Sequence, residues 1–538
     1  MDYSTDKNSS SSESDYSIDD ISHGQTSVSP RLVPSLDRRK VLMVYPKMGF
    51  SGEFVRHTPL GLIYASSELV KNGIETEIFD TRLSPKTWET DLKDKLDDNI
   101  LVVGISVLTG APIKHAIEIG RLVKEIDPNI NVVWGGPHAT FHPETILEEQ
   151  SCDYVVSGYG STPFYKLVEC LIENSDLEKT KIEGVYYRNN GQIKGVPPKN
   201  EFEVLNHLDI PYHLIKDYSK YGQLEEENLI FSIYSIAGCP YKCTFCSSPA
   251  QYKNIGKRWL PFDVANVVDH IEFLVNEYDA GYIYFIDDDS FVNLKHVEQI
   301  IDELNQRQIN VKLAFRGARI NEIKKMSDEF LEKLVEAGTQ IMHVGAESGS
   351  NRILRFIKKN CTVDDILLCN RKLAKHKKLR VGYNFIFGVP TETLEEAKST
   401  AELMLRLIEE NPACVIFTPN KFRPLPGTEL GDFVAEKWVY DKPETLEDWI
   451  NIEVEGEYES PWHPPKLTNY FNLILLASYF IDDKIFKMTT GNSAFYKILR
   501  FLCWLYKPII KFRLKHNIYH FLLEYQLYRF IVNRSNKS

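Results

Sequence analysis

"YSIAGCPYKCTFCSSP", residues 234–249, places Cys239, Cys243 and Cys246 where an apolar strand runs into a polar loop. The chain has 9 cysteines among 538 residues, so chance is a poor explanation for three of them in so short a stretch. The strand also opens a series of strand and helix units. In such a series, ligands collect where the strands end, and the cysteines stand at one of these ends.

Five more apolar runs follow this stretch, separated by helical segments: "YIYFID", "VKLAFRG", "QIMHVGAE", "LRVGYNFIFG" and "CVIFTP". Together with "LIFSIYSIAG" they make six units in a row, which predicts a parallel barrel, whole or partial, over residues 229–430. Its active site should lie at the carboxyl ends of the strands.

The same alternation occupies residues 37–175, from "KVLMVYP" to "DYVVSG". Continuous apolar strands need helices on both faces, so this segment predicts an α/β domain built on a doubly wound parallel sheet. Three other segments complete the expected organisation: a Ser- and Asp-rich disordered arm at 1–36, a connector at 176–228 with a hairpin turn at Asn190–Gly191, and a helical region at 431–538.

The composition is that of a globular protein, with 43% apolar and 26% charged residues. A net charge of −12 disfavours nucleic acid as a partner, because phosphate binding needs a basic surface. Few cysteines and no apolar leader at the start predict the reducing cytoplasm. The best apolar run, "LILLASYFI" at 473–481, is about half of what a spanning helix needs.

The cysteine trio allows three interpretations. Three buried small hydrophobes are one, although Pro240, Lys242 and Thr244 interrupt any apolar face. A zinc site is another, but it needs a fourth ligand, which Cys361, Cys369 or Cys414 could supply only by folding back. An iron–sulfur cube held by three thiolates fits better, because it leaves one iron open for a substrate or cofactor.

The spacing C-x-x-x-C-x-x-C after the first barrel strand, with Phe245 before the last cysteine, resembles the signature of radical S-adenosylmethionine (SAM) enzymes. The resemblance implies that Cys239, Cys243 and Cys246 hold a 4Fe-4S cluster whose open iron binds SAM. Reductive cleavage of SAM would then give a 5′-deoxyadenosyl radical.

Three downstream segments resemble the SAM-binding motifs of that family: "IDDDSF" at 286–291, "VGAESGS" at 344–350 and "FIFGVPTET" at 385–393. Taken alone, they could also be a helix N-cap cluster, a solvated strand end and a turn. The resemblance implies SAM contacts for Phe245, Asp288, Glu347, Ser348, Gly388 and Pro390.

The segment in front resembles the sheets of cobalamin-binding members of the family. "SVL" at 106–108 and "GG" at 135–136 end successive strands, where ligands of open parallel sheets bind, and "GYGS" follows at 158–161. Each motif alone could be a cap or a bare turn. The resemblance implies cobalamin contacts for Ser106, Leu108, Gly135, Gly136 and Gly158.

Two departures from that pattern matter. "YPKMGFSGEF" at 45–54 lacks the Asp-x-His-x-x-Gly of many cobalamin sheets, so no histidine is expected as lower cobalt ligand, and His57 in the next loop is expected to be solvated or capping. "GYGS" also lacks the acids of the family's usual Gly-Glu-Gly-Glu.

The resemblance implies a cobalamin-dependent methyltransferase that acts on an unactivated carbon or a phosphorus centre of a small or lipid-like molecule, with flavodoxin or ferredoxin as electron donor. A radical cyclisation, rearrangement or oxidation on the same scaffold is the alternative, and a non-catalytic metal-containing binding or sensor protein is a third. No catalytic residue is predicted.

The last segment, 493–538, has nine Lys or Arg and one acid, Glu524, among many aromatic residues. This composition suits peripheral contact with an anionic membrane surface. A helical cap packed over the barrel mouth is the other interpretation.

Overall fold

The computed structural model describes residues 38–526 except 48–54, 200, 224–227, 254–257, 438–442, 453–459, 461, 485–493 and 521. The described residues all belong to one compact unit of the chain. The arm expected at 1–36 lies outside the described residues, as do parts of "YPKMGFSGEF" and of the last segment.

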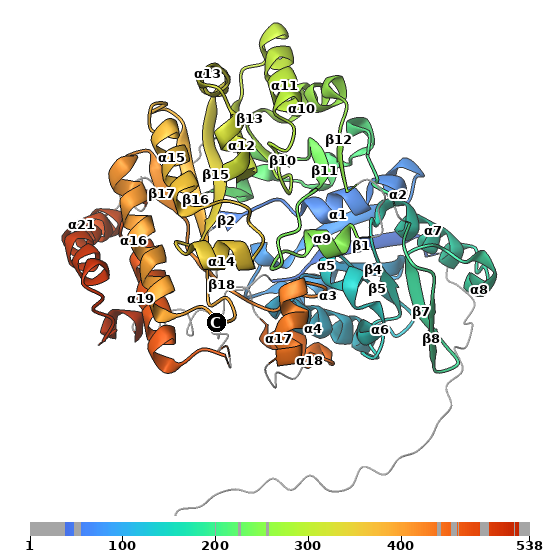
Figure 1. The fold of residues 1–538 in the computed structure, drawn as a ribbon. Coiled ribbons are helices and arrows are strands. Elements are labelled where there is room, and N and C mark those ends of the chain that lie inside the picture. The colour runs from blue at the N-terminus through green and yellow to red at the C-terminus, as the bar shows by residue number, and fades with distance from the viewer. Residues whose placement is uncertain are drawn as a thin grey trace, which may run out of the picture. The chain divides into compact units, whose positions relative to one another are not determined.

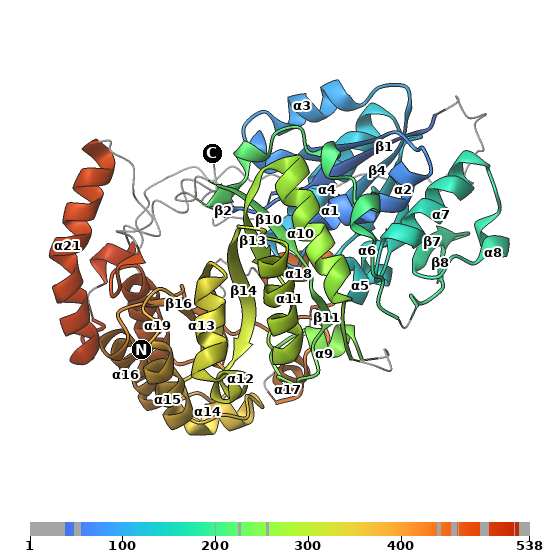
Figure 2. The same cartoon turned by 90° about the horizontal axis from the view of Figure 1, so that it is seen from above.

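The first sheet has the strand order β3-β1-β4-β5-β6-β7-β8, and the strands from β3 to β6 pair in parallel (Figures 1 and 2). This order is that of a doubly wound sheet, and the switch in direction of winding lies between β1 and β4. The strands are β1 (Lys40–Tyr45), β3 (Thr76–Asp80), β4 (Ile100–Ser106), β5 (Asn131–Gly135), β6 (Tyr154–Val156), β7 (Val185–Asn189) and β8 (Gln192–Gly195).

The sheet is covered on both faces, because its strands carry apolar side chains on both sides. Leu42 and Val103 belong to one buried cluster, and Val41 and Val102 belong to a second. The expectation of a doubly wound α/β sheet is confirmed. Its helices are α1 (Leu60–Ala65), α2 (Ser67–Lys71), α3 (Trp88–Lys95), α4 (Ala111–Ile126), α5 (Pro137–Phe141), α6 (Pro143–Ile146), α7 (Ser161–Ile172) and α8 (Leu177–Thr180).

The expected hairpin forms with its turn at Asn190–Gly191, where both residues have positive φ. Its strands β7 and β8 do not stand apart as a linker. They continue the first sheet as an antiparallel edge, because β7 pairs with β6. The Asn-Gly turn is enough to predict the hairpin from the sequence. That β7 pairs with β6 has no signal in the local sequence.

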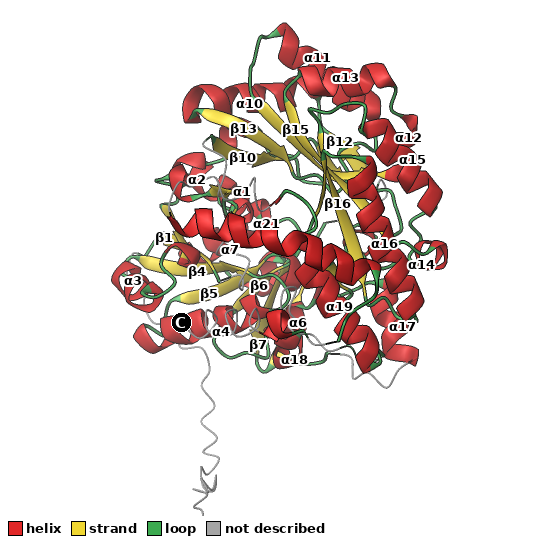
Figure 3. Ribbon diagram, turned by 90° about the vertical axis from the view of Figure 1, so that its left-hand side faces the viewer, coloured by secondary structure: helices red, strands yellow, loops and turns green. Residues whose placement is uncertain are grey.

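The second sheet has the strand order β10-β13-β14-β15-β16-β17, all parallel, with β18 beside the end of β16 (Figures 1 and 3). No pairing closes β17 onto β10 within the described residues, so the barrel is partial, as expected. The strands are β10 (Leu229–Ile233), β13 (Ala280–Phe285), β14 (Lys312–Arg319), β15 (Thr339–Glu347), β16 (Arg380–Phe387), β17 (Cys414–Ile416) and β18 (Asn420–Lys421).

The connecting helices begin at strong caps: Asn293 precedes one helix, and Thr362 and Thr393 form capping boxes. They are α9 (Ser248–Gln251), α10 (Val264–Tyr278), α11 (Leu294–Gln306), α12 (Ile320–Lys325), α13 (Asp328–Glu336), α14 (Asn351–Phe356), α15 (Val363–Leu373) and α16 (Leu394–Glu410). Two small antiparallel pairs complete the sheets: β11 (Ile236–Gly238) with β12 (Trp259–Pro261), and β2 (Val55–Arg56) with β9 (Gly222–Gln223).

The region after the barrel is helical, as expected, but it divides between the two sheets. Leu446, Trp449 and Ile452 join the buried cluster of the first sheet beside α4, whereas α19 and α21 pack against α16 on the outside of the barrel. No described helix is long and apolar enough to cross a membrane. The helices are α17 (Glu429–Lys437), α18 (Leu446–Asn451), α19 (Pro465–Ser478) and α21 (Ala494–Lys515).

Candidate active site

A cavity of about 480 Å³ lies between the carboxyl edge of the first sheet and the start of the barrel. Met43, Ser106 and Gly135 line it from the sheet, at the switch point where doubly wound sheets bind ligands. Gly238 and Asp288 line it from the barrel. This interdomain cavity therefore extends from the sheet to the residue before Cys239.

The two predicted cobalamin motifs, "SVL" and "GG", meet at this edge. The amide of Val107 donates to the carbonyl of Gly135 at 2.8 Å, and Gly136 adopts a φ of 94°. A Cβ on Gly136 would lie 2.9 Å from the Ser106 hydroxyl and from the Val107 nitrogen, so this position requires glycine. A Cβ on Gly135 would meet only the Val156 carbonyl, at 3.7 Å, and would fill part of the cavity edge instead.

The remaining predicted cobalamin residues differ in their placement. Gly158 lines the cavity with a φ of 81°, and a Cβ there would press on Pro198 at 2.7 Å. Leu108 is half-buried and is not part of the cavity lining. The structure thus brings Ser106, Gly135, Gly136 and Gly158 together, and it leaves Leu108 beside them.

The cysteine loop between β11 and α9 is anchored at several points by neighbouring elements. The Tyr241 hydroxyl donates to the Glu322 carboxylate at 2.6 Å. The Thr244 amide donates to the Ile357 carbonyl at 3.3 Å, and the Thr244 carbonyl accepts from Leu430 at 2.9 Å. These contacts hold the loop in place from α12, α14 and α17.

Arg319, at the end of β14, supplies the main charge beside the thiols. Its guanidinium donates to the Cys243 sulfur at 3.0 Å, stacks 3.9 Å above the Tyr241 ring and donates to the Lys359 carbonyl at 2.8 Å. Burial opposes its charge, but Cys243, with further help from Asp289, raises the pKa of Arg319 above its ordinary value.

The donor set of the loop fits a cluster better than a single ion. Among the described residues, no three His, Cys, Asp or Glu side chains converge on a point where one metal ion would bind. Thiolates on a cube each bind a different iron and need no common point. Cys361, Cys369 and Cys414, the possible fourth zinc ligands, are packed into the barrel core.

Glu347 is the last residue of β15 and Ser348 follows the strand. Both residues are buried, so they do not form a solvated strand end. Glu347 has a φ of 67° and accepts from the Lys359 ammonium at 2.8 Å, with both side chains under 9% exposed. The Ser348 hydroxyl accepts from the Ser350 amide at 3.1 Å and lies 3.4 Å from the Thr400 hydroxyl. Ser348 therefore holds the turn that positions Glu347.

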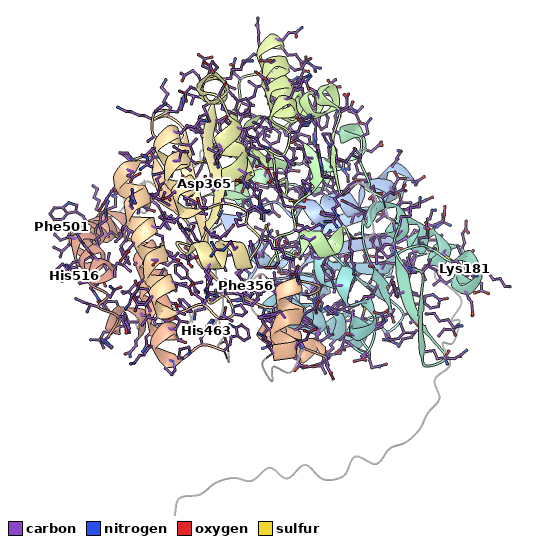
Figure 4. The ribbon with its side chains drawn as sticks, in the orientation of Figure 1. Lys181, Phe356, Asp365, His463, Phe501 and His516 are labelled. Atoms are coloured by element: carbon purple, nitrogen blue, oxygen red, sulfur yellow. The ribbon has the colours of Figure 1, made fainter. Side chains whose placement is uncertain are left out.

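The turn after β16 contains Gly388 and Pro390. Gly388 has a φ of 78°, and a Cβ there would lie 2.8 Å from the ring of His463, which Figure 4 labels. Its amide donates to Glu392 at 2.6 Å, and its carbonyl accepts from the Trp462 indole at 3.1 Å. Phe245 packs against the apolar cluster that includes Ile386 and Val389. Pro390, the residue after Val389, is also buried.

The acids after β13 are not a helix cap, because Asn293 caps the following helix. Asp287 is buried and accepts from the Ser235 amide and hydroxyl, both at 2.7 Å. Burial raises the pKa of Asp287 to about 6. Asp288 instead lines the interdomain cavity, where burial raises its pKa, while Arg316 opposes that rise.

Sequence reasoning missed a polar group on the inner face of the barrel. The rings of Tyr284 and His343 lie 5.4 Å apart, and His57 reaches over from the first domain to stack 6.0 Å from Tyr284. Burial, then Arg316 and His57, lowers the pKa of His343 to about 3, so it is neutral. The sequence pattern that could have predicted this group is a polar residue between two apolar residues of a buried strand. Tyr284 is such a residue, because it lies between the buried Ile283 and Phe285.

Two family models match this chain: the radical SAM superfamily over residues 233–404 and the B12 binding domain over residues 55–168. The "Uncharacterized methyltransferase PH0819" of Pyrococcus horikoshii is 31% identical over 401 residues, which make up 73% of this chain and 83% of that protein. The chain belongs to the cobalamin-binding radical SAM enzymes.

Two further similarities agree with this membership. The anaerobic magnesium-protoporphyrin IX monomethyl ester cyclase of Rubrivivax gelatinosus is 24% identical, over 75% of this chain and 73% of the cyclase. The solved structure of the cobalamin-dependent SAM radical enzyme OxsB, with aqua-cobalamin and SAM bound, shares the fold at a TM-score of 0.67. That match has 17% identity and covers 93% of this chain and 76% of OxsB.

A radical SAM enzyme of this branch uses a 4Fe-4S cluster, SAM and cobalamin, so the cofactors expected from the sequence are confirmed. The residues fit these groups, because three thiols share one anchored loop and a glycine-lined sheet edge opens into a cavity. The contacts of individual residues with the cofactors stay predictions.

Proposed function

We propose that this enzyme methylates an unactivated carbon or a phosphorus centre. One observation carries the proposal: the interdomain cavity is lined both by the predicted cobalamin edge and by Gly238, which precedes the first cysteine. A methyl group held on the sheet would thus be near a radical generated at the cysteine loop. The 31% identity to a protein named as a methyltransferase supports the same reaction.

The bound cofactors supply the 5′-deoxyadenosyl radical and the carrier of the methyl group. One substrate R–H, two molecules of SAM and two electrons then give R–CH₃, S-adenosylhomocysteine, methionine and 5′-deoxyadenosine. The hydrogen of R–H leaves with 5′-deoxyadenosine, and the new bond joins the methyl carbon to the substrate radical. The electrons come from an external donor of the flavodoxin or ferredoxin type.

The chain divides this work between its segments. Residues 37–175 hold cobalamin at Ser106, Leu108, Gly135, Gly136 and Gly158, and residues 229–430 hold the cluster and SAM. Cys239, Cys243 and Cys246 are the thiolate ligands. Burial raises the pKa values of Cys239 and Cys246, so cluster assembly must displace their protons.

SAM is expected beside the cluster at the carboxyl ends of the barrel strands. Two of the proposed SAM contacts have different surroundings. Lys359 holds the carboxylate of Glu347, whereas Ser348 stabilises the turn that positions Glu347. The full set of proposed contacts is Phe245, Asp288, Glu347, Ser348, Gly388 and Pro390.

The inner face of the barrel supplies the substrate contacts. Tyr284, Arg316 and His343 come from neighbouring strands, and the hydroxyl of Tyr284 lies 3.4 Å from Nδ1 of His343. A neutral imidazole and a phenol can position a polar group of the substrate without transferring its proton. The cation of Arg316 favours a substrate that carries an anionic group nearby.

The first half of the reaction can be tested without the substrate. The chain is reconstituted anaerobically with iron, sulfide and cobalamin, reduced chemically and given SAM labelled in its methyl group. We expect S-adenosylhomocysteine and label on the protein-bound cobalamin, together with 5′-deoxyadenosine. The Gly135→Val variant should lose the label, because its side chain would fill the cavity edge.

The similarity to the anaerobic cyclase favours a second candidate, radical cyclisation or oxidation without methyl transfer. In that case the reduced enzyme would release 5′-deoxyadenosine with neither S-adenosylhomocysteine nor label on cobalamin. This result would reject methylation while leaving the radical chemistry intact.

A further inference from the structure

Helix α21 exposes an apolar face that no described element covers. Its inner side packs on α16 and α19 through Cys503, Ile510 and Leu514, which are at most 2% exposed. On the outer side, seven large apolar side chains are each 49–63% exposed: Ile498, Phe501, Leu502, Trp504, Leu505, Ile509 and Phe512. Figure 3 shows the helix lying on the outside of the barrel, and Figure 4 shows Phe501 directed away from the body of the molecule.

The spacing of these residues makes one continuous stripe. Positions 498, 501, 502, 505, 509 and 512 recur at intervals of three and four, so they share a helix face. That face lies well away from the inner one, which contains 503, 510 and 514. A surface helix is normally polar where it faces water, and an apolar stripe of this length marks an interaction site.

The charged residues of α21 itself are all basic. Residues 494–515 include Lys497, Arg500, Lys507, Lys511, Arg513 and Lys515 and no acid, in a chain whose net charge is −12. Arg513 is directed inward and pairs with Glu524 at 2.8 Å, and Lys507 pairs with Asp483 at 2.6 Å. Lys497 and Lys515 are exposed near the two ends of the helix.

We propose that α21 docks this enzyme on an anionic lipid bilayer. The helix lies parallel to the surface, its outer stripe enters the boundary between headgroups and acyl chains, and Lys497, Lys511 and Lys515 face lipid phosphates. This inference is independent of the reaction proposed above. It decides between the two interpretations of the last segment, because α21 packs on the outer helix layer and its apolar side chains remain exposed.

Charge complementarity distinguishes the membrane from a second copy of the chain. Two copies meeting along the stripe would bring two basic rims together, with no acid on either helix to pair with them. An anionic bilayer offers both an apolar layer and the opposite charge. The apolar stripe and the basic residues beside it therefore complement an anionic lipid surface better than they complement a second copy of α21.

The test is vesicle flotation with the full-length reconstituted enzyme. We expect binding to phosphatidylcholine vesicles that contain phosphatidylglycerol, weaker binding to phosphatidylcholine alone and release by salt. A Phe501→Ser/Trp504→Ser/Phe512→Ser variant should lose binding. Lys497→Glu/Lys515→Glu should weaken it by about 25-fold or more, since each basic residue contributes about fivefold near an anionic surface.

Matched controls separate docking from folding. Leu208→Ser and Leu368→Ser also remove exposed apolar side chains, 69% and 54% exposed, but on other elements, and both should bind as the wild type does. Brominated lipid should quench tryptophan fluorescence in the wild type and less in Trp504→Phe, which keeps the apolar surface.

Two results would overturn the proposal. One is a wild-type enzyme that stays unbound on anionic vesicles. The other is a wild-type dimer by light scattering that the triple serine variant converts to a monomer, with no flotation of either protein.

Discussion

The buried pair of Glu347 and Lys359 links the predicted SAM site to the cysteine loop. Its partners lie 2.8 Å apart at 8% and 6% exposure, and the carbonyl of Lys359 accepts from Arg319. Removing one member of such a pair leaves an unpaired buried charge, which costs far more than the pair contributes when it is complete.

Lys359→Met should therefore lower the free energy of unfolding by about 3–5 kcal/mol. Glu347→Gln/Lys359→Met should recover much of this loss, because it removes both charges together. Chemical denaturation of the two variants and the wild type measures the difference. Equal destabilisation by the single and double changes would contradict the role of the pair.

Arg319 should set the reduction potential of the cluster through its bond to Cys243. A positive charge and a hydrogen bond at a thiolate favour the reduced, more negative cluster. Arg319→Gln should therefore lower the midpoint potential by tens of millivolts, roughly, in a redox titration followed by electron paramagnetic resonance. Arg371→Gln, which removes an exposed arginine from the surface of α15, should leave the potential unchanged.

The turn after β16 holds the carboxyl group of Glu392 in an apolar setting. Burial raises the pKa of Glu392 to about 8, although the Gly388 amide opposes the rise. Within the described residues, its Oε1 has no hydrogen-bond partner. The folded state therefore keeps this proton at a pH where the unfolded chain releases it.

This shift predicts a pH-dependent difference between the wild type and Glu392→Gln. The stabilisation from proton binding is complete below the unfolded pKa of about 4.5 and is lost as the pH rises through about 8. The difference between a pKa of about 4.5 and one of about 8 corresponds to roughly 5 kcal/mol. Urea midpoints from pH 5 to 9 should fall more steeply in the wild type, and parallel slopes would contradict the assignment.

The loops after β4 and β5 predict opposite effects for adjacent glycines. Gly136→Ala should lower the free energy of unfolding by about 1–3 kcal/mol, because its φ of 94° and its contact with Ser106 both disfavour a Cβ. Gly135→Val should fold normally and bind cobalamin at least tenfold more weakly. Chemical denaturation measures the first effect, and equilibrium dialysis with cobalamin measures the second. If neither variant binds cobalamin more weakly than the wild type, this sheet edge is not the cobalamin site.

The elements that the sequence predicted are those with local signals. Buried parallel strands are continuous apolar runs, so both sheets and the position of Cys239 could be read directly. The contact between "SVL" and "GG" depends on strand order, which the doubly wound pattern implies. The addition of β7 to the first sheet and the bond from Arg319 to Cys243 depend on tertiary contacts without a local pattern.

The two domains pack against each other at two separate places. Leu60 and Ile63 of α1 belong to the buried cluster of the barrel, together with Tyr212 of the segment between the sheets. After the barrel, the chain returns to the first sheet, where Trp449 of α18 is 2% exposed. Between these contacts, Leu430 of α17 is bonded to the cysteine loop.

This continuity predicts that a change in the return segment weakens both cofactor sites. Trp449 packs beside the rings of His138 and His142, with centroids 5.7 and 4.6 Å away, so Trp449→Ala should lower the free energy of unfolding by about 3–5 kcal/mol. If the sheets unfold together, cobalamin and cluster absorbance should be lost in one transition at a lower temperature. Trp504→Ala removes an exposed tryptophan and should leave that transition in place. Two separate transitions, with only the cobalamin signal shifted, would mean that the domains unfold independently and that the shared packing does not couple them.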